Sequence, residues 1–229
     1  MQILSDLNVV IMGIEDFVDE VGKRLPSLKD YLNSTEFIGG IRQLFRGRVS
    51  EDEFWDDFVA KIVFRFPEVC QEGGAEALDN EWFKRLFYQT TQKTMPGTLD
   101  VFKRIMYYPM HVGHGGRVGD GMPDVILVAD SANESILELH NYHPEVFETA
   151  AAEVWSSRFH QVKTDPFFFS FMLKGFHGEP DEYLFISRDQ EAIDLAEKSG
   201  IPCIKFIDAE QTENEMSRLG FMFYPKEEL

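Results

Sequence analysis

The segment EYLFISRDQEAIDLAEKSGIPCIKFID, residues 182–208, limits the possible folds more than any other part of the chain. Its first apolar run, EYLFIS, indicates a strand that is buried on both faces. The residues DQEAIDLAEKSG predict a helix that ends at Gly200, and IPCIKFID predicts a second strand. A helix that joins two buried strands is typical of a βαβ unit, so we expect a parallel sheet.

Two other apolar segments, LNVVIM (7–12) and DVILVADS (124–131), predict further buried strands of this sheet. The segments HPEVFETAAAEVW (143–155) and DPFFFSFMLKGF (165–176) predict helices, the second started by its Asp-Pro pair. In the tail from residue 209 we expect a last helix or an edge strand. The fold class is therefore α/β, and ligands of such sheets bind beyond the carboxyl ends of the strands.

Helical spacing replaces the strand pattern between residues 17 and 95. The stretch SEDEFWDDFVAKIVFRF opens with Ser50 and has Glu53 three residues later, which predicts a capping box at the start of an amphipathic helix. The stretch NEWFKRLFYQTTQ repeats this pattern, with Asn80 as the expected N-cap. We therefore expect a helical subdomain between the first strand and the rest of the sheet.

The segment PMHVGHGGRVGDGMP, residues 109–123, has five glycines and no periodicity, so we expect a loop. It lacks the Gly-Lys-Ser/Thr of a phosphate-binding loop and precedes a strand, which places it away from the carboxyl ends of the sheet. It is best interpreted as a connection or a partner-binding loop. The pairs His111/His114 and His140/His143 lack the additional ligands of a structural zinc site.

The charge of the chain argues against several classes of partner. Its 40 acidic residues against 22 lysines and arginines give a net charge of −18, which repels nucleic acid and anionic membranes. No apolar run approaches the length that spans a bilayer, and the N-terminal residues lack a basic region like that of a signal peptide. With only Cys70 and Cys203 as cysteines, we expect a cytoplasmic protein without a disulfide framework.

Four stretches carry a family likeness: LFRGRVSEDEFWDDF, MPGTLDVFKRI, VKTDPFFFSFML and EYLFISRDQEAIDLAEKSGIPCIKFID. They resemble the haloacid dehalogenase-like hydrolase superfamily over nearly the whole chain, and within it the group that includes the alpha-glucose-1-phosphate phosphatases. The resemblance implies a Rossmann-like core with a helical cap inserted after the first strand. The boundaries drawn from periodicity fit this plan, with a core of residues 1–16 and 96–229 and a cap of residues 17–95.

Phosphatases of this family need an aspartate nucleophile, a second acid two residues later, and carboxylates that hold Mg²⁺. Two frames are possible for the nucleophile. In one, Asp6 is the nucleophile and Asn8 replaces the second acid; in the other, Gly13 and Glu15 take these two positions. The spacing to the RGRVS segment favours Asp6, whereas the uniformly apolar LNVVIM favours Gly13.

The resemblance also implies a Ser or Thr and a Lys that hold the anion. The chain offers Ser131 for the first, although Asp130 stands at the position where a phosphate would be held and would repel it. Both residues are also suited to cap the helix that follows. Lys163 fits the lysine position, because the residues around it match; an alternative is a surface lysine whose stem lies along an aromatic helix.

The loop after the strand EYLFIS departs from the family pattern. Where two metal-binding acids are expected, this chain has Ser187 and Arg188. A guanidinium is always charged and repels a cation, so we expect no bound metal. Arg188 is free to bind an anion, or to pair with Asp130 or Asp6. The 2-haloacid dehalogenases of the same superfamily also carry Ser here, work without metal and attack carbon with the same aspartate.

Two functions follow from these residues. The first is a degenerate, weakly active or inactive member of the superfamily that binds a small anion or a partner protein through Asn8, Asp130, Ser187 and Arg188. The second is a true hydrolase that uses Asp6, Ser131 and Lys163. No cofactor is expected, except Mg²⁺ if the chain is a phosphatase after all. Neither nucleic acid nor a membrane is an expected partner.

Overall fold

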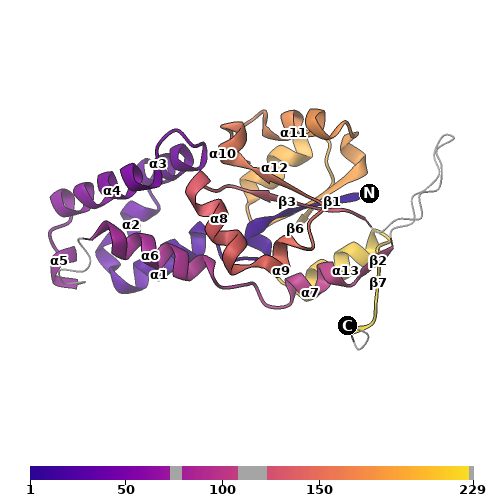
Figure 1. The fold of residues 1–229 in the computed structure, drawn as a ribbon, viewed down its shortest axis with the longest axis horizontal. Helices are drawn as coiled ribbons and strands as arrows, with labels where there is room; N and C mark the ends of the chain where they lie inside the picture. The colour runs from indigo at the N-terminus through magenta and orange to yellow at the C-terminus, as the bar shows by residue number, and fades with distance from the viewer. Residues whose placement is uncertain (73–78, 108–122, 227–229) are drawn as a thin grey trace.

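Five parallel strands form one sheet in the part of the chain that the computed structural model describes, which is residues 1–72, 79–107 and 123–226. The order across the sheet is β4-β3-β1-β5-β6 (Figure 1). In chain order the strands are β1 (Gln2–Asp6), β3 (Val125–Ala129), β4 (Ala152–Trp155), β5 (Tyr183–Ser187) and β6 (Cys203–Lys205). The predicted α/β class with a parallel sheet is confirmed.

The central strand β1 is buried on both faces. Ile3 packs into an apolar cluster on one face and Leu4 into a cluster on the other, and neither side chain is exposed to solvent. The Leu4 face is covered by α11 (Phe168–Phe176) and α12 (Gln190–Lys198). The Ile3 face is covered by α7 (Thr98–Lys103), α8 (Asn133–Tyr142), α9 (Pro144–Phe147) and α13 (Ala209–Arg218).

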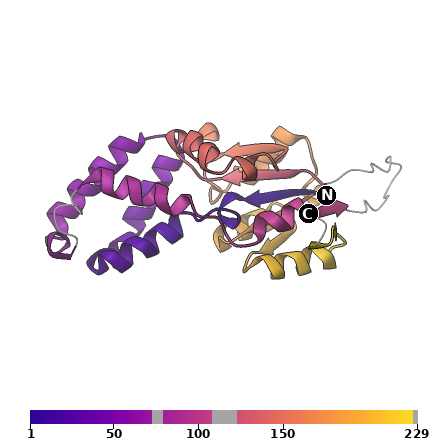
Figure 2. The ribbon, with the colours of Figure 1, turned by 60° about the horizontal axis from the view of Figure 1, so that its bottom comes forward.

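The helices between β1 and α7 form a separate layer with its own apolar core. In chain order they are α1 (Ile14–Arg24), α2 (Lys29–Leu32), α3 (Thr35–Phe45), α4 (Glu51–Arg65), α5 (Val69–Glu72) and α6 (Asn80–Thr91). At the centre of this layer, Phe17 contacts Trp55 and Phe87 edge to face, with ring centroids 5.7 and 5.6 Å apart. Figure 2 shows that these helices lie beyond the carboxyl ends of the strands. The residue boundaries assigned to core and cap stay a prediction.

Two connecting segments join the helical layer to the sheet, and they run side by side. The backbone N–H of Met95 donates to the carbonyl of Val10 at 2.7 Å, and that of Met12 donates to Lys93 at 2.9 Å. An antiparallel bridge between Ile11 and Thr94 lies between these bonds. The chain therefore leaves and re-enters the sheet at one place.

The remaining short elements lie at the edges of these layers. In chain order they are η1 (Leu7–Val9), η2 (Pro26–Leu28), β2 (Ile105–Tyr107), α10 (Ser156–Phe159), η4 (Pro180–Glu182) and β7 (Met222–Phe223). Strand β7 pairs with β2 in an antiparallel sheet, so the tail after residue 208 contains both a helix and an edge strand. No helix within the described residues is long and apolar enough to cross a membrane.

Three sequence predictions are wrong. Residues 7–12 do not form a strand, because β1 spans Gln2–Asp6 and Leu7–Val9 form a 3-10 turn. Their apolar side chains are buried against the sheet, and burial alone does not distinguish a turn from a strand. The helix expected at 143–155 is only α9, followed by β4. The pairing of β4 with β3 outweighs the helix propensity of the alanines at 150–152. The N-cap of α6 is Asp79, whose Oδ1 accepts the N–H of Glu81 at 3.0 Å, and Asn80 is the first helical residue.

Two other expectations have clear outcomes. The capping box of α4 is confirmed, since Ser50 Oγ accepts the Glu53 N–H and Glu53 accepts the Ser50 N–H. The helix expected from Asp165 begins at Phe168, because the Asp165 carboxylate bonds the Val162 N–H and Arg46. The glycine-rich loop, apart from Pro123, lies outside the described residues, together with His111 and His114.

Candidate functional site

Asp6 is the last residue of the central strand, and its side chain is fully buried. Its two carboxylate oxygens have different partners. Lys163 donates from Nζ to Oδ1, which also accepts the Asn8 N–H at 3.4 Å. Ser187 donates from Oγ to Oδ2 at 2.6 Å. Because charge buried without partners is costly, these donors are what allows a carboxylate at this position.

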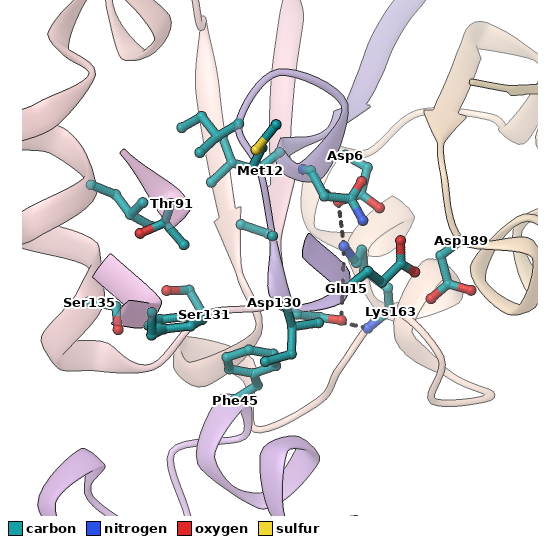
Figure 3. A pocket seen from close by; sticks show the side chains of 18 residues that line it. Asp6, Met12, Glu15, Phe45, Thr91, Asp130, Ser131, Ser135, Lys163 and Asp189 are labelled. Atoms are coloured by element: carbon teal, nitrogen blue, oxygen red, sulfur yellow. Dashed lines mark hydrogen bonds and ion pairs between the residues drawn. The ribbon is translucent and has the colours of Figure 1, made fainter. Parts of the chain in front are cut away.

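The fold brings both partners of Asp6 to it from distant parts of the chain. Ser187 ends β5, which is paired directly with β1, and its Oγ also accepts the Asp189 N–H at 3.0 Å. Lys163 follows α10, and its backbone N–H donates to Asp130 Oδ1 at 3.0 Å. Its Nζ lies 3.9 Å from Asp130 Oδ2, so the ammonium lies between two carboxylates, as Figure 3 shows.

Burial and charge act in opposite directions on Lys163 and Asp130. Burial alone would lower the pKa of Lys163, but the carboxylates of Asp6 and Asp130 outweigh it and the pKa is raised. For Asp130, burial raises the pKa to about 6, although the charge of Lys163 opposes this rise. Lys163 is therefore a fixed cation, whereas Asp130 exchanges its proton near neutral pH.

The other residue after β3, Ser131, does not reach Asp6. Its backbone N–H donates to Ser156 Oγ at 3.1 Å, and its own Oγ donates to the Ala132 carbonyl at 3.3 Å. Figure 3 shows it beside Ser135, apart from Asp6 and Lys163. Neither Asp130 nor Ser131 caps α8, whose N-cap is Ala132.

Arg188 does not pair with Asp130 or Asp6, so this part of the prediction is wrong. Its guanidinium binds Asp16 of α1 at 2.8 and 3.3 Å and lies 4.0 Å from Glu15. Burial would raise the pKa of Asp16, but hydrogen bonds from Arg188 and the Gly13 N–H lower it. The arginine therefore ties β5 to the helical layer instead of filling the space beside Asp6.

Two acidic residues of the site are not among the site residues chosen from the sequence: Glu15, which is the second acid of the Gly13 frame, and Asp189. Glu15 and Asp189 line the same pocket as Asp6, and burial raises the pKa of Glu15 although Arg188 opposes the rise. In the sequence, Glu15 is indicated only by the GIEDF segment, which is the alternative to Asp6 for the nucleophile position. In the structure the first strand ends at Asp6, whereas Gly13 is the N-cap of α1, so Glu15 lies in the first turn of that helix.

A pocket of about 110 Å³ lies between the strand ends and the helical layer, and Asp6, Asp130 and Lys163 line it (Figure 3). Asn8 also lines it, and its Oδ1 is buried without a hydrogen-bond partner in the described structure. Among the described lining residues, Lys163 is the only lysine or arginine, against four carboxyl groups: Asp6, Glu15, Asp130 and Asp189.

Mg²⁺ prefers octahedral oxygen ligands, and the carboxylates of Asp6 and Asp189 already have partners within the protein. Both oxygens of Asp6 already accept hydrogen bonds from Lys163 and Ser187. The Asp189 carboxylate accepts the first N–H groups of α12. Within the described ranges, no three His, Cys, Asp or Glu side chains are grouped as metal ligands. His140 bonds Glu153 at 3.0 Å and His143 bonds the Thr91 carbonyl at 2.7 Å, so neither is arranged for zinc.

Comparison with known proteins identifies the fold. No protein-family model and no curated protein matches the sequence. A predicted HAD-like family hydrolase from Porphyromonas gingivalis superposes with a TM-score of 0.66 at 14% identity, over 95% of this chain and 96% of that one. A HAD family enzyme from Bacteroides thetaiotaomicron, solved as a magnesium complex, gives 0.61 at 15% identity, over 95% and 98%.

A third solved structure is that of a dehalogenase. The L-2-haloacid dehalogenase from Xanthobacter autotrophicus gives a TM-score of 0.52 at 13% identity, over 95% of this chain and 82% of that one. All three likenesses extend over both the sheet and the helical layer of the chain. The protein therefore has the fold of the haloacid dehalogenase-like hydrolases: a Rossmann-like parallel sheet with a helical cap.

Proposed function

We propose that the protein is a metal-independent hydrolase in which Asp6 attacks an electrophilic carbon. The observation that carries this proposal is the pair of donors on Asp6: Lys163 and Ser187 hold both oxygens of a fully buried carboxylate at the wall of a pocket. A carboxylate fixed in this way is oriented toward a substrate in the pocket. The solved Xanthobacter structure with chloropropionic acid covalently bound supports carbon chemistry on this fold.

The charges of the pocket favour carbon over phosphorus as the reacting atom. A phosphate monoester carries its own negative charge, and a cation must neutralise it before a carboxylate can attack. The described lining offers one lysine, which Asp6 and Asp130 already share. A carbon centre with a leaving group has no such requirement.

The reaction has two steps. One oxygen of Asp6 forms a bond to the substrate carbon, and the leaving group departs with the electron pair of its broken bond. Water then adds to Cγ of the Asp6 ester and gives a proton to Asp130. The tetrahedral oxyanion collapses, and the departing alkoxide takes the proton from Asp130 to become the alcohol product. The second proton of the water is then lost from Asp6 through Asp130 to solvent, which restores the Asp6 carboxylate. Lys163 and Ser187 stabilise the oxyanion, since they already bond these oxygens.

Asp130 suits the role of general base by position and by acidity. It shares Lys163 with Asp6, lines the pocket and has a side chain that is 18% exposed. Burial raises its pKa to about 6, which is close to the optimum for a base that works near neutral pH. Ser131 takes no part in this mechanism, because its hydrogen bonds are local.

A second candidate is the inactive, ligand-binding relative predicted from the sequence. One observation favours it: Asn8 stands where the resemblance places a second acid, and an amide cannot exchange a proton. Retention of the Asp6–Lys163 pair is consistent with both candidates, so activity has to decide between them.

The test combines three substrates with two variants. The wild type, Asp6→Asn and the control Asp124→Asn, at the opposite end of β3, are incubated with 1-bromobutane, with 2-chloropropionate and with p-nitrophenyl phosphate, with and without Mg²⁺. The proposal expects halide release without metal, lost in Asp6→Asn and kept in Asp124→Asn, and heavy oxygen from labelled water in the Asp6 carboxylate after several turnovers. Turnover of the phosphate ester that depends on Mg²⁺ and Asp6 would refute it, and a folded protein without any turnover supports the inactive candidate.

A further inference from the structure

A second pocket, of about 300 Å³, adjoins the one at Asp6. The two share Ile14, Glu15, Phe45, Asp130 and Asp189 in their walls, so they lie side by side. The first is too small for more than the reacting group of a substrate. The second therefore determines which kind of molecule can place its reactive carbon against Asp6.

The helical layer supplies an apolar wall to this second pocket. Its side chains come from α1, the end of α2 and α3, and the largest are Leu32, Phe37, Ile38, Ile41 and Phe45. Ile38 is 40% exposed although it is a large aliphatic residue on a helix that packs against its neighbours. An apolar group that covers this exposed apolar surface removes it from water, which favours binding.

The charged groups around the apolar wall are mostly acidic. Glu15, Asp19, Asp130 and Asp189 line the pocket, and Arg42 is the only lysine or arginine among its described lining residues. Arg42 already pairs with a carboxylate, because its Nη2 binds Glu191 Oε2 at 2.7 Å. An anionic ligand would therefore meet carboxylates on several sides without a free cation.

Asn8 adds an independent requirement at the Asp6 end. Its Oδ1 is buried and accepts no hydrogen bond in the described structure, which is an unfavourable state for a carbonyl oxygen. A ligand that carries an N–H or O–H group would satisfy it. A carboxylate or phosphate ester has only acceptors to offer and would not.

From these observations we infer that the substrate is an apolar chain or ring that carries an amine or alcohol group, and not an anion. The apolar part of the substrate occupies the second pocket, and its polar group lies between Asn8 and the carboxylates that line the two pockets. This inference rests on the proposed function, in which the reactive carbon of that substrate faces Asp6. It departs from the small anionic ligand predicted from the sequence, because Arg188 and Arg42 are both engaged by carboxylates.

The test uses three probes that differ only in their end group: 4-phenylbutylamine, 4-phenylbutanol and 4-phenylbutyrate. None has a leaving group, so binding is measured whether or not Asp6 is a nucleophile. Isothermal titration calorimetry in about 0.15 M salt limits general attraction to the acidic protein. We expect the amine and the alcohol to bind at least about 10-fold more tightly than the carboxylate.

Two variants locate the binding. Ile38→Trp fills the pocket and should weaken the amine and the alcohol by about 10-fold or more, whereas Val63→Trp, at a similarly exposed position on α4 outside the pocket, should leave both unchanged. Equal or tighter binding of the carboxylate, no binding of any probe at millimolar concentration, or equal effects of the two variants would each overturn the inference. Expected binding without any halide release would instead refute the proposed function.

Discussion

Arg46 at the end of α3 and Asp165 before α11 form a two-point ion pair across the contact between the helical layer and the sheet. Arg46 Nε donates to Asp165 Oδ2 at 3.0 Å and Nη2 donates to Oδ1. The two side chains are only 16% and 21% exposed. The Asp165 carboxylate also accepts the Val162 N–H, one residue before Lys163. This pair therefore connects the helical layer to the loop that carries the cation of the site.

Replacing Arg46 by Met should lower the free energy of unfolding by about 2 kcal/mol, the usual range for a partly buried hydrogen bond between charged groups. The matched control is Arg48→Met, because Arg48 is exposed and its Nη1 bonds only the Gln43 amide oxygen among the described contacts. Urea unfolding at neutral pH measures both variants. An equal loss of unfolding free energy in the two variants would contradict a stabilising role for the Arg46–Asp165 pair.

The same pair predicts a pH dependence. Burial would raise the pKa of Asp165, but the hydrogen bonds from Arg46 and Val162 lower it. A carboxyl group with a lowered pKa in the folded state stabilises that state above its ordinary pKa, about 3.9, and this contribution is lost as the pH falls through the lower value. The difference in unfolding free energy between wild type and Arg46→Met should therefore shrink at low pH. A difference that is constant down to the acid transition would exclude this linkage.

Lys163→Met should be the most destabilising single change in the site. It leaves the fully buried carboxylate of Asp6 without its cation, which typically costs about 3–5 kcal/mol. The double variant Asp6→Asn/Lys163→Met should recover part of this loss, since no unpaired charge remains. Lys174→Met on the exposed side of α11 is the control. A double variant as unstable as Lys163→Met alone would show that lost packing, and not charge, is responsible.

Glu51 predicts a pH effect of opposite sign. It begins α4, is 1% exposed, and accepts hydrogen bonds from Tyr88 at 2.6 Å and from Ser135 of α8 at 3.3 Å. Burial raises its pKa, although both bonds oppose the rise. A carboxyl group of this kind destabilises the folded state increasingly as the pH rises above its ordinary pKa, about 4.3. The unfolding free energy of Glu51→Gln should therefore increase relative to that of the wild type as the pH rises from about 4 to about 8. The exposed control Glu68→Gln should show no such trend.

Asp130→Asn tests the general base. If Asp6 forms an ester with 1-bromobutane, the variant should still form it but hydrolyse it about 10²–10⁴-fold more slowly. In the wild type, hydrolysis should decline as the pH falls through about 6, where Asp130 becomes protonated. This inflection should disappear in the variant and return in Asp130→Glu. Rapid-quench mass spectrometry of the ester follows both steps, and unchanged ester hydrolysis would remove Asp130 from the mechanism.

The regular parts of the fold could be predicted from the sequence because they depend on local patterns. Strands β3 and β5 are continuous apolar runs, and α4 has a capping box followed by an apolar face. The LNVVIM segment could not be predicted in this way. Its residues are as buried as those of a strand, but they pack as a turn, and only the pairing of Gln2–Asp6 with both neighbours decides which residues enter the sheet.

Only those parts of the candidate site that depend on where a strand ends could be predicted from the sequence. Asp6 and Ser187 lie together because each ends one of two paired strands, and Lys163 reaches Asp6 from the loop after α10. The partner of Arg188 could not be predicted, because Asp16 belongs to α1 and the tertiary packing of that helix brings the two together. The second pocket has no sequence motif at all, since its wall is assembled from three helices and is defined by shape.

Because the connectors at Val10 and Met95 are adjacent, the helical layer is an insertion at a single point of the sheet. Since both crossings lie at one hydrogen-bonded position, the inserted helices can differ in length without changing where the chain enters and leaves the sheet. Under the proposed function, substrate choice in the inserted helices and bond breaking at the strand ends can then change separately during evolution.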